Sequence, residues 1–141
     1  MEVFGFFNEV GIINQLSSAL LADCLPDGVH PSHFAIINHL VRMGDGKSPL
    51  RIANAMQVTK NTMTHSLKVL TDRGFVSVVP DPKDGRAKIV TLTDAGRAFR
   101  ETAIQRVLER FSQIFAPEHA ETMRRIQGDL ASIRKLLDDN R

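Results

Sequence analysis

Charged side chains are concentrated in the stretch DPKDGRAKI, residues 81–89. This stretch follows the valine-rich FVSVV and precedes VTLT, so it is predicted to form the tip of a β-hairpin. A hairpin needs only turn-forming residues to reverse its direction, and the extra charge indicates contact with a charged partner outside the fold. The charged residues are Asp81, Lys83, Asp84, Arg86 and Lys88.

A second polar set lies in TKNTMTHSLKVLTDRG, residues 59–74, which is predicted to be a helix. Thr59 is suited to cap its start and Gly74 to end it, which gives a helix of about 15 residues. Its apolar side, predicted to face a core, contains Met63, Leu67 and Leu70. Its opposite side contains Asn61, Thr64, His65 and Lys68. That side carries hydrogen-bonding groups and positive charge, so it is either an interface with a polar partner or a solvated face.

The charge distribution supports a polyanionic partner. The 141 residues carry a net charge of only +2, but Lys47 to Arg100 contain ten Lys or Arg against four Asp, a formal +6. The remaining residues together carry 8 basic and 12 acidic side chains, a formal −4. A basic middle between more acidic ends indicates a surface that faces nucleic acid, although clustering on a solvated face is an open alternative.

The remaining sequence predicts helices around this basic middle. Helical spacing of apolar residues predicts helices over 6–24, 32–43, 48–56, 94–115 and 117–137. Ser32 is expected to cap the second of these, and Ser48 and Pro49 to begin the third, with Leu50, Ala53 and Met56 on its buried side. The composition, 43% hydrophobic and 24% charged, is that of a globular protein with one domain, 1–141.

Two helices joined by the short turn QVT and followed by a hairpin predict a winged helix-turn-helix, in a mostly α fold with a small β wing. A helix fits the major groove of DNA, whereas an Arg at a hairpin tip fits the narrow minor groove. Arg86 is therefore expected in the minor groove with Asp84 paired to it, and Lys83 and Lys88 at phosphates. The helix that enters the major groove adds residues expected to contact phosphate or support the helix. These are Lys60, Thr62 and Arg73.

The run from residue 53 to residue 98 resembles the MarR family of bacterial transcription regulators. The most specific segments are LTDRGFV and DPKDGRAKIVTLTDAG, in which Asp84 and Arg86 match the family's Asp-x-Arg wing. Gly85 departs from the pattern, because many members have a second Arg there. The resemblance implies a homodimer that binds double-stranded DNA at a palindromic operator, most often as a repressor.

The resemblance also divides the chain by role. Residues 30–92 are the expected DNA-binding lobe, and residues 1–25 and 93–141 the dimerisation helices. The expected dimer contacts are Phe111, Met123, Ile126, Leu130, Ile133 and Leu137. A small-molecule effector is expected in the crevice between the dimerisation helices and the lobe. The residues placed there are Phe6, Val10, His33, Phe34 and Ile37, of which the apolar four are alternatively core residues.

Several questions stay open at this level. Cys24 is the single cysteine and is either a free structural thiol or a redox sensor, and Cys24, His30 and His33 are a weak zinc alternative. The absence of a phosphate loop, a nucleophile elbow or a metalloprotease motif argues against an enzyme, and no cofactor is expected. No membrane span or secretion signal is evident, so a cytoplasmic protein is expected. The competing function is a winged-helix protein-interaction module without operator binding.

Overall fold

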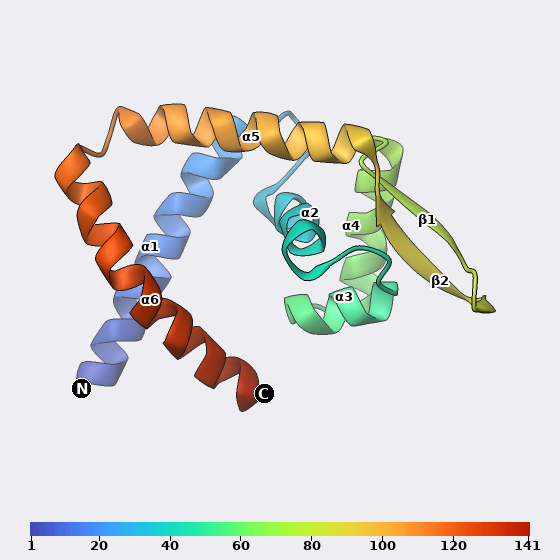
Figure 1. Ribbon diagram of the computed structural model, residues 1–141, viewed down its shortest axis with the longest axis horizontal. Helices are drawn as coiled ribbons and strands as arrows, with labels where there is room; N and C mark the ends of the chain where they lie inside the picture. Colours follow the sequence, from blue (N-terminus) through green and yellow to red (C-terminus); the bar gives the residue numbers. More distant parts are fainter. The chain divides into compact units, whose positions relative to one another are not determined.

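Six helices and one two-stranded hairpin make up the chain, and the computed structural model describes all 141 residues (Figure 1). The elements are α1 Glu2–Cys24, α2 Pro31–Met43, α3 Pro49–Met56, α4 Lys60–Asp72, β1 Val76–Asp81, β2 Asp84–Leu92, α5 Asp94–Ser112 and α6 Pro117–Asp139. They form two units, Met1–Val107 and Leu108–Arg141. The predicted class, mostly helical with a small β-hairpin, is confirmed.

The main core of the first unit lies among α2, α3, α4 and the base of the hairpin. The three apolar residues predicted to anchor α4 are all in it, at 5% exposure or less. The buried members are Ile36, Ile37, Leu40, Ile52, Ala53, Met63, Leu67, Leu70, Val76 and Val90. Because α4 has its apolar residues in this cluster, its opposite face is left at the surface.

Capping residues set the starts of α3 and α4. Ser48 Oγ accepts from the Arg51 N–H at 3.2 Å, and Thr59 Oγ1 accepts from the Thr62 N–H at 3.1 Å, as predicted. Between the two helices Gln57 has φ +56°, a left-handed conformation that permits the tight turn. The predicted buried side of α3 was partly wrong, because Leu50 is 55% exposed and Ile52 is buried instead.

The start of α2 differs from the prediction. Pro31 is the first residue of the helix, and Ser32 makes no cap. Instead the His33 imidazole reaches back, and its Nδ1 accepts from the His30 N–H at 2.9 Å. The N-cap is therefore His30, two residues before Ser32, because the fixed φ of Pro31 suits the first helical position.

The hairpin is longer than the apolar runs predicted. β1 and β2 pair antiparallel from Val76 opposite Leu92 to Asp81 opposite Asp84, with an irregularity after Pro80. The turn therefore consists of Pro82 and Lys83. Of the charged residues assigned to a nine-residue tip, Asp84, Arg86 and Lys88 lie in β2, whereas Asp81 ends β1 and Lys83 is in the turn.

The start of α5 is fastened to the end of α4. Thr93 Oγ1 caps α5 by accepting from the Gly96 N–H at 3.0 Å, and it donates to the Gly74 carbonyl at 2.6 Å. The Phe75 and Phe99 rings stack with centroids 4.3 Å apart. These contacts fix the hairpin, which begins directly after Phe75, relative to α5.

Apolar side chains remain exposed on the helices at both ends of the chain. In α1 they include Val3, Phe4, Phe6, Phe7, Val10, Ile12, Ile13 and Leu16. In the second unit α6 exposes Met123, Ile126, Leu130, Leu136 and Leu137. Ile133 in α6 and Phe111 at the end of α5 are half-buried. An isolated chain thus leaves large apolar faces in water, a pattern that marks interaction surfaces.

Candidate nucleic-acid interface

The polar face of α4 is fully at the surface, and its four predicted contact residues differ in how free they are. Thr64 Oγ1 donates to the Lys60 carbonyl at 3.0 Å, and Lys68 Nζ pairs with Asp72 Oδ2 at 2.7 Å. The Asn61 and His65 side chains are exposed and make no hydrogen bond or ion pair within the chain. Asn61 and His65 are therefore the two side chains on this face that need not give up an internal partner to bind another molecule.

The residues expected to contact phosphate or support α4 fall into separate roles. Thr62 Oγ1 accepts from the capping hydroxyl of Thr59 at 3.0 Å, so it belongs to the start of the helix. Arg73, directly after α4, donates from Nη2 to the Asp27 carbonyl in the loop after α1. Lys60 is exposed on the first turn of α4 and forms no ion pair. Of the three, Lys60 is the one whose exposed charge has no internal hydrogen bond or ion pair.

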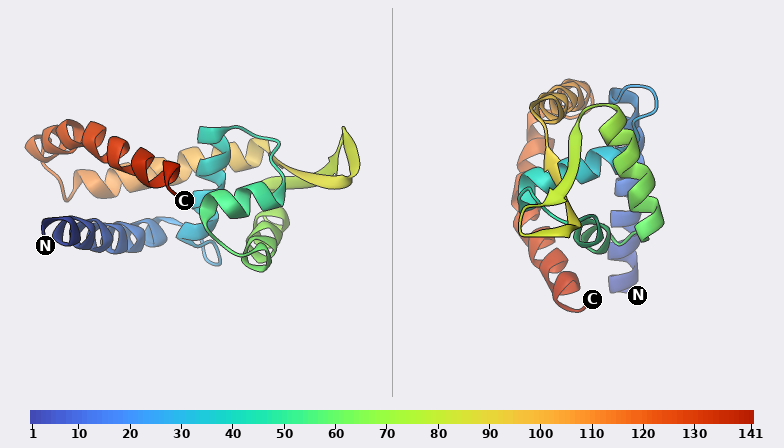
Figure 2. Two further views of the ribbon diagram at one scale, coloured as in Figure 1. Left: turned by 90° about the horizontal axis from the view of Figure 1, so that it is seen from below. Right: turned by 90° about the vertical axis from the view of Figure 1, so that its right-hand side faces the viewer.

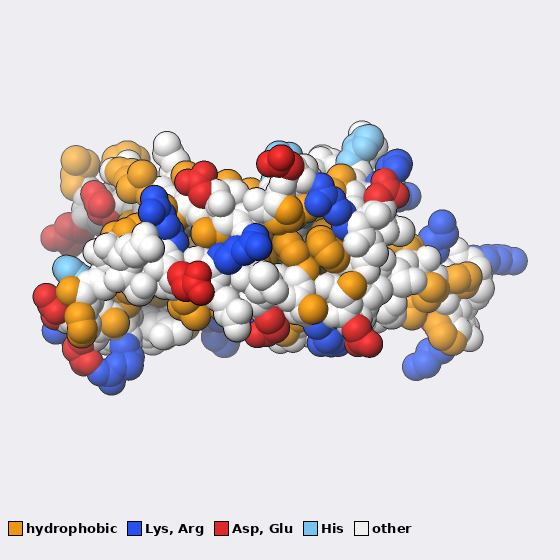
Figure 3. Space-filling view, turned by 90° about the horizontal axis from the view of Figure 1, so that it is seen from above, with side chains coloured by type: hydrophobic (Ala, Val, Ile, Leu, Met, Phe, Trp, Pro, Cys, Tyr) orange, Lys and Arg blue, Asp and Glu red, His pale blue; other side chains and the backbone are white.

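The hairpin projects away from the helices of the first unit (Figure 2). Lys83, Arg86 and Lys88 are exposed on it, and in Figure 3 the projecting end shows Lys and Arg side chains beside apolar ones. The expected side-chain pair of Asp84 with Arg86 is not formed. Asp84 Oδ1 instead accepts from the Arg86 backbone N–H at 3.1 Å, which leaves the Arg86 guanidinium without an ion-pair partner.

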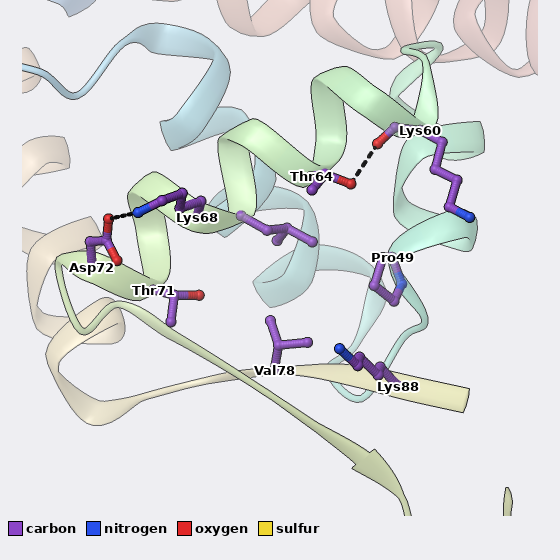
Figure 4. Close-up of a pocket in the computed structure, with 9 residues that line it drawn as sticks. Pro49, Lys60, Thr64, Lys68, Thr71, Asp72, Val78 and Lys88 are labelled. Atoms are coloured by element: carbon purple, nitrogen blue, oxygen red, sulfur yellow. Dashed lines mark hydrogen bonds and ion pairs between the residues drawn. The ribbon is translucent and has the colours of Figure 1, made fainter. Parts of the chain in front are cut away.

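A groove of about 490 Å³ lies between α4 and the hairpin (Figure 4). Lys60 and Lys68 from α4 and Lys88 from β2 line it together with a single acid, Asp72, which pairs with Lys68. The remaining lining residues are Pro49, Thr64, Leu67, Thr71 and Val78, of which Thr71 and Val78 were not singled out from the sequence. The structure thus brings the two predicted basic surfaces, α4 and the wing, to opposite walls of one groove.

Asp45 was missed by the sequence reasoning. Its carboxylate accepts from the Leu92 N–H at 3.0 and 3.1 Å and lies 3.9 Å from Arg97 Nη2. It therefore connects the loop after α2 with the base of the hairpin and the first turns of α5. An acid between two glycines, in Gly44-Asp45-Gly46, was the available signal, because such a position is free to bend toward a neighbouring backbone.

The residues expected to line an effector crevice are spread over different environments. Ile37 is fully buried and His33 is 7% exposed, whereas Phe34 is half-buried. Phe6 and Val10 on α1 are each 37% exposed. Because Ile37 is a core residue, a ligand would reach it only by displacing side chains of the main core.

Burial lowers the pKa of His33, and the positive charges of His30 and Arg73 lower it further. The neutral imidazole is required by the N-cap hydrogen bond, since Nδ1 can accept only when it carries no proton.

Cys24 is a half-buried free thiol, and no group of three or more His, Cys, Asp or Glu side chains is arranged to hold a metal ion.

None of the helices combines the length and the apolar character that crossing a lipid bilayer requires.

Comparison with known proteins gives one consistent result. A model of the MarR family matches residues 27–87. The HTH-type transcriptional regulator PecS of Dickeya dadantii is 29% identical over 94 residues, which are 67% of this chain and 57% of PecS. This chain therefore matches little more than half the length of that relative.

Two solved structures show the same fold along nearly the whole chain. BldR from Sulfolobus solfataricus superposes with a TM-score of 0.77 at 23% identity, over 98% of this chain and 96% of BldR. A mutant MarR from E. coli, complexed with operator DNA, gives a TM-score of 0.66 at 20% identity, over 92% of this chain and 95% of that one.

Proposed function

The chain belongs to the MarR family of winged helix-turn-helix transcription regulators, and from this premise we propose that it binds operator DNA as a homodimer and represses transcription. The observation that carries the proposal is the groove between α4 and the hairpin, whose two walls present Lys60, Lys68 and Lys88. A helix can enter the major groove while a basic hairpin beside it reaches the neighbouring minor groove.

The lobe formed by residues 30–92 makes the DNA contacts in this proposal. α4 enters the major groove, where Asn61 and His65 meet base edges with donor and acceptor groups that no internal partner occupies. The hairpin lies along the DNA backbone beside α4. Its Arg86 guanidinium reaches the minor groove, and Lys83 and Lys88 contact phosphates. Asp84 holds the strand by its bond to the Arg86 N–H, which directs that side chain outward.

The apolar faces of α1 and α6 support dimerisation. Met123, Ile126 and Leu130 follow one another by three and four residues along α6 and are 40–45% exposed in the single chain. Exposed apolar stripes of this spacing are stabilised when a second helix covers them. A two-fold dimer presents two α4 helices and therefore reads a palindromic site.

Regulation by a small molecule is the next part of the proposal. The ligand would bind between α1 and the DNA-binding lobe, beside Phe6, Val10, His33 and Phe34. To release DNA it must bind one spacing of the two lobes more tightly than the other, because equal affinity leaves the equilibrium unchanged. We place this regulator in the cytoplasm, where its DNA target would be.

Selection from a random DNA pool tests the proposed function directly. We expect the full-length protein to enrich a palindromic sequence, whose affinity then falls steeply as salt rises. Fluorescence anisotropy with the selected site and a scrambled site of the same length gives the specificity ratio. If no sequence is enriched, or if the selected and scrambled duplexes bind equally, the protein is not an operator-binding regulator, and the interaction-module alternative takes its place.

A further inference from the structure

A small pocket of about 130 Å³ lies between α2 and α3, away from the groove beside the hairpin. The residues that line it are His39, Met43, Lys47, Arg51 and Ala55. Three of the five carry basic side chains, none is acidic, and neither Lys47 nor Arg51 belongs to the α4 and hairpin surfaces described above. The pocket is therefore a separate concentration of positive charge.

The backbone holds the three basic residues in fixed places. Lys47 pairs with β2, because its carbonyl accepts from the Val90 N–H at 2.8 Å. Arg51 lies in the first turn of α3, where its N–H donates to the capping hydroxyl of Ser48. His39 is a half-buried residue of α2. Three different elements thus converge on one pocket without requiring a loop to move.

The positive charge of the pocket is not compensated from within the chain. Lys47, Arg51 and the neighbouring Arg42 form no ion pair. The carboxylate nearest in sequence, Asp45, is occupied by the Leu92 N–H and by Arg97. Burial lowers the pKa of His39, and the positive charges of Arg42 and Lys47 lower it further. An anion in the pocket would relieve the repulsion among these groups.

We propose that the pocket of His39, Lys47 and Arg51 is a binding site for a phosphate group. A volume of about 130 Å³ equals about four water molecules, at roughly 30 Å³ each, which suits a compact oxyanion and is too small for a drug-sized ligand. Arg donates two parallel hydrogen bonds to phosphate oxygens, and Lys adds a point charge. A phosphate monoester, with about 1.5 to 2 negative charges at neutral pH, balances this set better than a monovalent carboxylate.

The phosphate can come from two sources, a free phosphate compound or the backbone of bound DNA. The first arm of the test contains no DNA, so its result does not depend on the proposed operator binding. The His39 pKa is measured by NMR, with and without inorganic phosphate, at constant ionic strength adjusted with chloride. We expect phosphate to raise this pKa by about one unit, as an opposite charge within 4–6 Å does.

Two variants make the first arm specific. Arg51→Gln removes one positive side chain from the pocket and should abolish most of the shift. Arg106→Gln removes the same charge from an exposed position on α5 that forms no ion pair, and should leave the shift intact. An equal shift in all three proteins would reflect general screening and would overturn a free-phosphate site.

The second arm measures DNA affinity against salt for the same proteins. If a DNA phosphate occupies the pocket, Arg51→Gln and Lys47→Gln should each flatten the slope of log affinity against log salt by about 0.9 for every phosphate that is no longer neutralised, whereas Arg106→Gln should not. A response to free phosphate with an unchanged slope assigns the site to a phosphorylated ligand. The absence of both the His39 shift and the slope change would refute the phosphate site, even if wild-type protein binds its operator normally.

Discussion

Asp84 and Arg86 are joined through the backbone, since Asp84 Oδ1 accepts from the Arg86 N–H at 3.1 Å and leaves the guanidinium free of any ion pair. The acid therefore fixes the strand rather than neutralising the arginine. If the two side chains formed an ion pair, that pair would have to break before Arg86 could enter a minor groove, which would cost electrostatic energy. In this arrangement the charge is available to DNA from the start.

Arg86→Ala is expected to weaken binding to both specific and non-specific DNA. Each phosphate-neutralising charge contributes about 0.9 to the salt slope, so removal of the residue from both subunits should flatten it by about one to two units. Anisotropy titrations at several salt concentrations measure this, with Arg106→Ala as the charge-matched control. Wild-type affinity and slope in a folded, dimeric Arg86→Ala protein would show that the hairpin does not contact DNA through this residue.

His65→Ala should change sequence preference instead of the salt slope. His65 is exposed on α4 without an internal partner, so its ring nitrogens are available to a base edge. If it contacts a base, its removal should cost roughly 1 to 3 kcal/mol of discrimination at one base pair in each half-site. Selection of DNA from a random pool with the variant and with the wild type measures the base preference at each position of the site. An unchanged preference at every position would assign His65 to a solvated face.

Gly96→Ala should destabilise the first unit. A β-carbon at residue 96 would overlap the Phe75 carbonyl oxygen and lie 2.9 Å from Leu92 Cδ1, and the backbone carbonyl cannot rotate away as a flexible side chain could. Crowding of this kind typically costs about 1–3 kcal/mol. Urea unfolding of the variant measures the decrease in stability. Gly85→Ala, where a β-carbon meets nothing within 4 Å, is the matched control and should change stability little.

Much of this architecture was predictable, because it rests on local signals. Ser48 and Thr59 have short side chains that cap helices, and the apolar spacing of α4 fixed which face is buried. The start of α2 was placed two residues late because the preference of Pro31 for the first helical position outweighed the capping tendency of Ser32, and the bond from the His30 N–H to His33 Nδ1 depends on a rotamer that sequence does not specify. Asp45 accepts from the N–H of Leu92, which lies 47 residues further along the chain, and no local sequence pattern predicts such a contact.

The sequence predicted which residues lie on the candidate DNA-contact surface, but not which of their side chains are free of internal bonds. Helical periodicity placed four polar residues on the free face of α4, but it could not tell that Thr64 and Lys68 bond within their own helix. Position along the chain also suggested Ile37 as a crevice residue, whereas the packing of α2 against α3 and α4 buries it completely. Both differences arise from side-chain contacts that three- and four-residue spacing does not distinguish.

Leu130→Asp with Ile133→Asp should prevent formation of a folded dimer. Leu130 is 40% exposed and Ile133 half-buried in the single chain, and two charges in an apolar contact between subunits would each lose their hydration. Sedimentation at micromolar concentration measures the oligomeric state. Ser132→Asp lies on the same helix outside the apolar stripe and should remain dimeric. A well-folded wild-type monomer under these conditions would contradict the proposed dimer.

Acid should destabilise the fold partly through His33. Burial and the nearby His30 and Arg73 lower its pKa in the folded protein, so the unfolded chain takes up a proton at a higher pH than the folded one does. The stabilising contribution is therefore complete above the unfolded pKa of about 6.5 and is lost as pH falls through the lower folded value. His39 shifts in the same direction, so wild-type protein alone would not separate the two.

The variant His33→Gln separates the contribution of His33 to acid sensitivity from that of His39. A glutamine three residues after the N-cap can accept from the His30 N–H through its side-chain oxygen, as in a capping box, but it has no proton to gain in this range. Urea unfolding followed from pH 8 to pH 5 should therefore give a smaller decrease in stability for His33→Gln than for the wild type. His119→Gln is the matched control, because His119 Nδ1 accepts from the Ala116 N–H at 2.9 Å at the exposed start of α6. The His119→Gln protein should lose stability with falling pH as the wild type does. Equal pH dependence of wild type and His33→Gln would show that the His33 imidazole does not govern the acid sensitivity of the fold.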